Sequence, residues 1–183
     1  RYREMDNETL IADAEANATG QRLFANSCAM CHGSDARGAR GFPNLTDDDW
    51  LYGDSFDIVM QGIADGRAGV MPVLVGHMDD DAISDLVVYV QSLSGQKADE
   101  AMAANGKQTY DMFCVACHMP DGSGNQALGS PRLNDDIWLY GGEPETIRTT
   151  ITQGRNGSMP AHKDLLSEDR RRLIAAYVLS LSK

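Results

Sequence analysis

Two pentapeptides carry most of the chemistry that this sequence can perform: Cys28-Ala29-Met30-Cys31-His32 and Cys114-Val115-Ala116-Cys117-His118. In a Cys-x-x-Cys-His segment the cysteines can form thioethers with the vinyl groups of a haem, and the histidine presents its imidazole to the iron. The chain has four cysteines, and the two motifs use them all. None remains for a disulfide or for a nucleophile. The sequence therefore predicts two covalent haem c groups, with thioethers at Cys28, Cys31, Cys114 and Cys117 and iron ligands at His32 and His118.

Cys-x-x-Cys also occurs in zinc sites and in redox-active thiol pairs. A zinc site would have to bring together cysteines 86 residues apart, and it would leave both histidines unexplained. A thiol pair of the thioredoxin type needs a strand followed by a helix, which the glycine-rich segments after the motifs do not indicate. Haem attachment is the stronger interpretation of both motifs.

The sequence around the first motif is repeated around the second. Four residues recur 86 positions later: Gly20, Phe24, Cys28 and His32 correspond to Gly106, Tyr110, Cys114 and His118. Beyond the motifs the offset is 88, which relates Pro43, Trp50, Arg67, Met71, Pro72 and Tyr89 to Pro131, Trp138, Arg155, Met159, Pro160 and Tyr177. Two homologous modules therefore fill the chain from Gly20 onward.

Each iron needs a second axial ligand, and a methionine thioether is a soft ligand that raises the reduction potential. Among nine methionines only Met71 and Met159 fall at equivalent positions, each before a proline. We therefore predict Met71 as the partner of His32 and Met159 as the partner of His118. His77 and His162 lie just beyond these methionines at non-equivalent positions, so surface loop residues are the better interpretation.

Further residues of the repeat are candidates for contacts around the haem. A ligating histidine needs its other ring nitrogen fixed by a hydrogen bond, and the carbonyls of Pro43 and Pro131 are natural acceptors. Guanidinium groups and indole N–H groups can bind haem propionates. We assign that role to Arg67, Arg155, Trp50 and Trp138, with structural packing as the alternative.

These residues have to be positioned by helices, since their spacing is helical before each motif and near the end of each module. We expect an all-α fold of two small modules, each wrapped round one haem. Residues 1–19 form a linker or peripheral helix, 20–95 the first domain, 96–105 a linker and 106–183 the second domain. A glycine and an aromatic residue one turn apart lead into each motif, which predicts a close crossing between the first and last helices of each module.

The formal charge of −11 is unevenly distributed along the chain. Residues 1–98 carry 16 acidic and 7 basic side chains, whereas residues 101–183 carry 9 of each. An acidic surface attracts cationic partners and disfavours nucleic acid. No apolar run approaches the roughly 20 residues that a membrane-spanning helix needs.

The motifs and their surroundings resemble tandem class I cytochrome c domains. The segment Gly41-Phe42-Pro43-Asn44-Leu45-Thr46-Asp47-Asp48-Asp49-Trp50-Leu51-Tyr52-Gly53 and the two Gly-Arg-x-Gly-x-Met-Pro runs resemble more specifically the dihaem subunit III of cbb3-type cytochrome c oxidases. The resemblance covers residues 20–183. It implies iron ligands at His32, Met71, His118 and Met159, and thioethers at the four cysteines. In that family a transmembrane helix precedes the haem domains, so we expect a soluble periplasmic fragment, attached to the bacterial inner membrane only through an anchor absent from this chain.

The resemblance implies a function without catalysis by the chain alone. The expected partners are a donor cytochrome and the catalytic subunits of the oxidase, and the more acidic first module is the expected entry point for electrons. A free-standing dihaem shuttle of the c4 type is the alternative. A dihaem peroxidase or a sensor is less favoured, because its chemistry needs an open or labile axial position.

Overall fold

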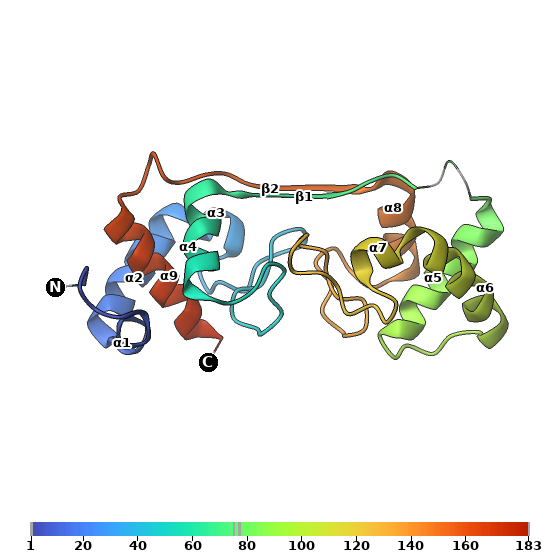
Figure 1. Cartoon of the computed structure of the whole chain (residues 1–183), viewed down its shortest axis with the longest axis horizontal. Coiled ribbons are helices and arrows are strands. Elements are labelled where there is room, and N and C mark those ends of the chain that lie inside the picture. The colour runs from blue at the N-terminus through green and yellow to red at the C-terminus, as the bar shows by residue number, and fades with distance from the viewer. Residues whose placement is uncertain (1, 75, 77, 183) are drawn as a thin grey trace. The chain divides into compact units, whose positions relative to one another are not determined.

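The computed structural model describes residues 2–74, 76 and 78–182 (Figure 1). In this part of the chain nine helices and two strands form, so the fold is mainly helical as expected. The helices are α1 (Asn7–Ala12), α2 (Ala14–Ser27), α3 (Ala29–His32), α4 (Phe56–Asp65), α5 (Asp80–Leu93), α6 (Glu100–Phe113), α7 (Val115–His118), α8 (Pro144–Gln153) and α9 (Glu168–Leu181). The strands, β1 (Arg67–Met71) and β2 (Arg155–Met159), pair with each other.

Aspartates begin most of the long helices. The carboxylates of Asp13, Asp79 and Asp99 accept hydrogen bonds from the first free backbone N–H groups of α2, α5 and α6, which such caps satisfy at a gain of about 1 kcal/mol. Acidic residues in the first turns of these helices also stabilise them, because their negative charge lies at the positive end of the helix dipole. Much of the negative charge of the sequence thus has a local structural use.

The described residues group into two compact units. Unit 1 comprises Arg1–Ala68 and Ser158–Lys183, and unit 2 comprises Gly69–Gly157. The division falls inside β1 and inside β2, strands that the expected all-α fold did not include. Each unit therefore takes the first helices of one sequence repeat and the last helix of the other.

The core of unit 1 forms where α2 packs against α9. Gly20 of α2 lies against the backbone of Leu173 and against Tyr177, and the Tyr177 ring packs edge-on to Phe24 at 5.5 Å between centroids. Helix α1 also packs on α9 and buries Leu10 completely. Leu10 and Ala16, from the segment expected to be a linker or peripheral helix, are therefore part of this core, and α2 begins six residues before Gly20.

The core of unit 2 repeats this arrangement where α6 packs against α5. Gly106 lies against the backbone of Asp85 and against Tyr89, and the rings of Tyr89 and Tyr110 are 5.1 Å apart, edge to face. Helix α8 covers α5, with Ile147 and Ile151 buried.

The crossing of first and last helices is confirmed, but the expected partners are wrong. The first helix of repeat 1 crosses the last helix of repeat 2, and the first helix of repeat 2 crosses the last helix of repeat 1. The repeat itself explains the error, because Tyr89 and Tyr177 occupy equivalent positions and either one fits the groove above a helical glycine. No helix in the described part of the chain is both long and apolar enough to cross a bilayer.

Candidate haem-binding sites

Each Cys-x-x-Cys-His motif lies at a break between two helices. Helix α2 ends at Ser27, and Cys28 closes it while also beginning the short helix α3. The backbone N–H groups of Cys31 and His32 both donate to the Cys28 carbonyl, at 3.1 and 3.0 Å. Cys114 has the same place between α6 and α7, with bonds of 3.1 and 2.9 Å from Cys117 and His118. The motif is thus held as one helical turn, with its cysteines and histidine close together.

The expected hydrogen bonds from the motif histidines to proline carbonyls are present in both units. His32 Nδ1 lies 3.1 Å from the Pro43 carbonyl oxygen, and His118 Nδ1 lies 3.0 Å from that of Pro131. A carbonyl oxygen can only accept, so Nδ1 carries the proton in each ring. Nε2 therefore keeps its lone pair and is the atom that can bind iron.

The two histidines differ in exposure. His118 is buried at 8% exposure, whereas His32 is half-buried. Burial lowers the pKa of His118, and the hydrogen bond to the Pro131 carbonyl offsets only part of this effect. The ring is therefore held in the neutral form that coordinates metals.

None of the four cysteines forms a disulfide, so each remains available for a thioether. Burial raises the pKa of Cys28 to about 11 and that of Cys114 to about 11, with a smaller contribution from the neighbouring motif cysteine. The described residues contain no group of three histidine, cysteine or carboxylate side chains arranged to hold a metal ion, which gives the zinc alternative no support.

The predicted axial methionines lie in the opposite units from those expected. Met159 packs against the core of unit 1, which also contacts Cys28, and Met71 packs against the core of unit 2, which contains Cys114. His32 is therefore grouped with Met159, and His118 with Met71. Each unit thus contains two thiols, an imidazole with a free Nε2 and a half-buried thioether, the types of donor that bind haem c.

The backbone after each motif histidine turns through a left-handed conformation. Gly33 adopts φ 79° in unit 1, while Met119, its counterpart in unit 2, adopts φ 64°, which is costly for a residue with a side chain. The Tyr110 hydroxyl donates to the Met119 carbonyl at 2.7 Å, and the counterpart Phe24 has no hydroxyl. The sequence analysis missed this support, although the paired changes Phe24 to Tyr110 and Gly33 to Met119 were visible in the repeat.

Both candidate propionate arginines have partners within the protein. The Arg67 guanidinium lies 4.8 Å from the centre of the Tyr52 ring and donates to the Ile58 carbonyl. Arg155 lies 4.3 Å from the centre of the Tyr140 ring and donates twice to the Thr150 hydroxyl. These contacts hold the arginines in place and use only part of their five donors.

The candidate tryptophans and the remaining histidines have different surroundings. Trp50 packs against the core of unit 1 and Trp138 against that of unit 2. His162 is half-buried, and its Nδ1 atom is buried without a hydrogen-bond partner in the described part of the chain, so it is not the exposed loop residue that we expected. His77 lies outside the described residues.

Comparison with known proteins gives a consistent result. The family model described as "Cytochrome C oxidase, cbb3-type, subunit III" matches twice, at residues 15–90 and 101–178. The matches follow the sequence repeats. A CcoP subunit of a cbb3-type cytochrome c oxidase from Rubrivivax gelatinosus is 46% identical over 96% of this chain, and the chain covers 58% of that protein.

Two further relatives have related names. The FixP subunit from Bradyrhizobium diazoefficiens is 43% identical over 92% of this chain, which covers 62% of that protein. The CcoP subunit from Rhodobacter capsulatus is 42% identical over 96% of the chain and is covered to 67%. The chain thus spans about three-fifths of the length of the first two relatives.

Proposed function

This chain belongs to the family of subunit III of cbb3-type cytochrome c oxidases, and we propose that it passes electrons from a donor cytochrome toward the catalytic subunit of such an oxidase. Its cofactors are two haem c groups, one for each motif. The observation that carries the proposal is the presence of a complete set of haem ligands in each unit.

The ligands are assigned by unit. His32 and Met159 hold one iron, and His118 and Met71 hold the other, with thioethers at Cys28 and Cys31 and at Cys114 and Cys117. Haem supplies one-electron redox chemistry when bound. An iron held by both a histidine and a methionine would exchange electrons without binding a substrate, which suits electron transfer and not substrate turnover. The chain by itself is therefore not an enzyme in this proposal.

The protein's part in the proposed function is to hold its ligands in one geometry. The Pro43 and Pro131 carbonyls orient the imidazoles and increase their basicity through the Nδ1 hydrogen bonds. Arg67 and Arg155, fixed over tyrosine rings, are the proposed donors to haem propionates together with Trp50, whereas Trp138 takes the packing role in unit 2. Rigid ligands reduce the structural change that accompanies each change of oxidation state.

A test of the ligand assignment uses proteins that attach a single haem. The double variant C114A/C117A keeps only the haem of the first motif, and a pyridine haemochrome assay should find one haem per chain in place of two. In this background Met159→Ala should remove the sulfur–iron charge-transfer band of the oxidised protein, while Met71→Ala should leave it. The reverse outcome would show that each methionine serves the histidine of its own repeat.

The proposed partners follow from the family and from charge. The relatives are named as subunits of cbb3-type oxidases, so the proposed acceptor is a catalytic subunit, at the periplasmic face of the bacterial inner membrane. A formal charge of −11 favours a basic donor. Reduction of the holoprotein by a basic cytochrome should slow steeply as ionic strength rises, and a rate independent of salt would contradict a basic donor.

A further inference from the structure

When the charges are counted by compact unit, unit 2 is the more acidic of the two, although residues 1–98 are the more acidic part of the sequence. Unit 1 carries 15 acidic and 11 basic side chains, a balance of −4, and unit 2 carries 12 acidic and 5 basic side chains, a balance of −7. The reason is that α5, with its acidic first turn, belongs to unit 2, whereas α9 brings Arg170, Arg171 and Arg172 into unit 1. A cationic partner is therefore attracted more strongly to unit 2, not to the unit with the first motif.

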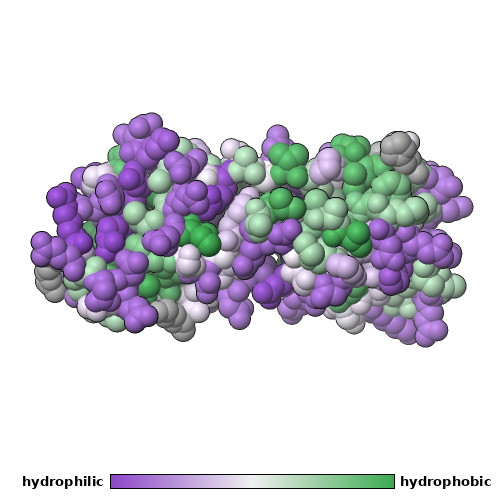
Figure 2. Space-filling view, in the orientation of Figure 1, coloured by the Kyte–Doolittle hydropathy of each residue, from purple (hydrophilic) through white to green (hydrophobic). Residues whose placement is uncertain are grey.

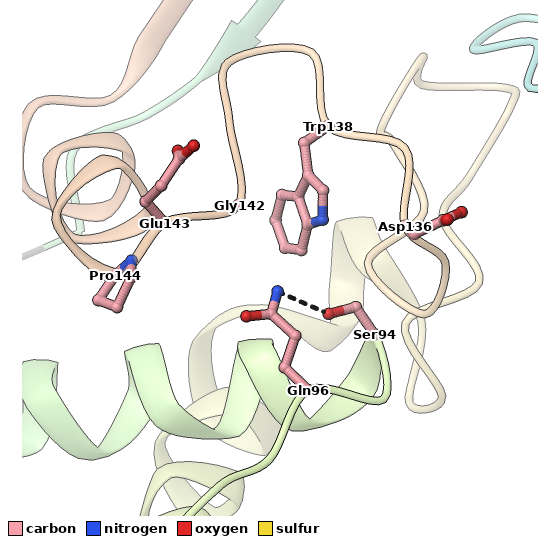
Figure 3. Close-up of a pocket in the computed structure, with 7 residues that line it drawn as sticks. All are labelled: Ser94, Gln96, Asp136, Trp138, Gly142, Glu143 and Pro144. Atoms are coloured by element: carbon pink, nitrogen blue, oxygen red, sulfur yellow. Dashed lines mark hydrogen bonds between the residues drawn. The ribbon is translucent and has the colours of Figure 1, made fainter.

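The surface of unit 2 contains a pocket of about 440 Å³ beside Trp138 (Figure 3). The indole points into the space between its own loop and the end of α5, where Ser94 and Gln96 are hydrogen-bonded to each other. Gly142 allows this arrangement, since a side chain there would approach the indole Nε1 atom to 2.7 Å. None of the residues proposed to ligate iron or form thioethers lines the pocket, so it is separate from the proposed ligand set.

The rim of the pocket is acidic. Asp136 and Glu143 flank the indole and point outward, both exposed (Figure 3). Glu143 occupies the position before α8 but makes no capping bond, and neither carboxylate has a hydrogen-bonding or ion-pairing partner in the part of the chain that the structure describes. No basic side chain lines the pocket. An aromatic wall below two unpaired carboxylates suits a side chain with an apolar stem and a cationic end.

The corresponding segment of unit 1 carries different side chains. Pro144 of the pocket corresponds to Phe56, which is buried at 9% exposure, and the guanidinium of Arg172 lies 5.3 Å from the centre of that ring. Glu143 corresponds to Ser55, whose hydroxyl caps α4. Unit 1 therefore lacks the carboxylate that Glu143 gives to unit 2, and its Phe56 contacts an arginine of its own unit. On the face shown in Figure 2, the larger hydrophobic patches lie over unit 2, interspersed with hydrophilic residues.

We propose that the Trp138 pocket of unit 2 receives a lysine or arginine side chain of a basic electron-carrier protein, and so directs electron exchange to the haem held by His118. This inference rests on the proposed function. Charge in the rest of unit 2 guides the encounter, and the pocket defines where the partner binds. A single anchored side chain in a desolvated pocket commonly provides much of the affinity of a small interface.

The test measures binding without electron transfer. The probe is a lysine-rich cytochrome c with zinc in place of iron, titrated calorimetrically into the dihaem protein at low ionic strength. The double variant Asp136→Asn and Glu143→Gln should weaken binding about tenfold. Pro144→Phe, which introduces the residue of unit 1 without changing charge, should weaken it at least about threefold. The matched control Asp48→Asn with Asp57→Asn removes two exposed charges from unit 1 and should change affinity less than about twofold.

Three results would overturn the inference. Equal losses in the two double variants would mean that only net charge matters. Unchanged binding in Pro144→Phe would mean that the pocket is not used. Pocket variants that alter self-association in sedimentation, but not binding of the probe, would identify a second copy of this chain as the occupant. Normal probe binding by a protein that transfers no electrons would contradict the proposed function and still support the pocket.

Discussion

A methyl group added at Gly106 should destabilise unit 2, although alanine is the better helix former. Gly106 lies where α6 crosses α5, and a Cβ atom there would stand 2.8 Å from Tyr89 Cβ and 2.5 Å from the carbonyl carbon of Asp85. Ordinary contacts of a Cβ atom begin near 3.4 Å. The Asp85 carbonyl oxygen lies nearer still, so the helices would have to separate by at least about 0.9 Å. All three atoms belong to the backbone or are the first side-chain carbon, and they cannot swing aside.

Two opposing terms determine the size of the effect. Overpacking a tight contact costs about 1–3 kcal/mol, while replacing glycine by alanine within a helix gains about 0.5–1 kcal/mol. Gly106→Ala should therefore lower the free energy of unfolding by about 1–2 kcal/mol. Gly106→Val should cost more, because its second branch meets the same backbone.

The matched control is Gly62→Ala in α4. Its added Cβ atom would meet only the flexible Arg67 side chain, at 3.4 to 3.6 Å, so the helix propensity gain of up to about 1 kcal/mol should remain. Chemical unfolding of the holoprotein, followed by far-ultraviolet circular dichroism, measures both. Stabilisation of Gly106→Ala to the same extent as Gly62→Ala would refute the close crossing of α5 and α6.

Three further results are expected from equilibrium unfolding. Tyr110→Phe should lower the free energy of unfolding by about 1–2 kcal/mol, since it leaves the Met119 carbonyl without its hydrogen bond. Met119→Gly should raise the free energy of unfolding, because glycine adopts the positive φ of this position without strain. A stabilising Tyr110→Phe or a destabilising Met119→Gly would contradict this account. Arg148→Met should cost about 0.5–1 kcal/mol through lost polar contacts with α5, and methionine already occupies the equivalent position of repeat 1. The Arg3 guanidinium lowers the pKa of Asp169, so Arg3→Ala should lower the melting temperature at neutral pH. That difference should vanish as the pH falls through the lowered pKa and Asp169 becomes neutral; a difference that persists in acid would rule out the ion pair as its source.

Local chemistry was predictable from the sequence. The two Cys-x-x-Cys-His motifs, the repeat and the proline carbonyls that accept from His32 and His118 all depend on residues close together along the chain. The haem c cofactors and the helical character follow from the same short-range patterns. Residues 1–19 were harder, because their role depends on Leu10 filling a core that a distant helix completes.

The choice between two equivalent partners was decided only by the tertiary structure. Tyr89 and Tyr177 fit either helical glycine equally well, so periodicity predicts the crossing without predicting its members. The tertiary contacts around Arg148 of α8 distinguish the two possibilities. Arg148 donates to Ser84 and Asp80 of α5. If α9 took the place of α5, Arg172, the repeat counterpart of Ser84, would lie against the guanidinium of Arg148. Arg172 instead donates to the Met5 carbonyl. The observed arrangement avoids repulsion between these two arginines. It is also the arrangement that groups each histidine with the methionine of the other repeat.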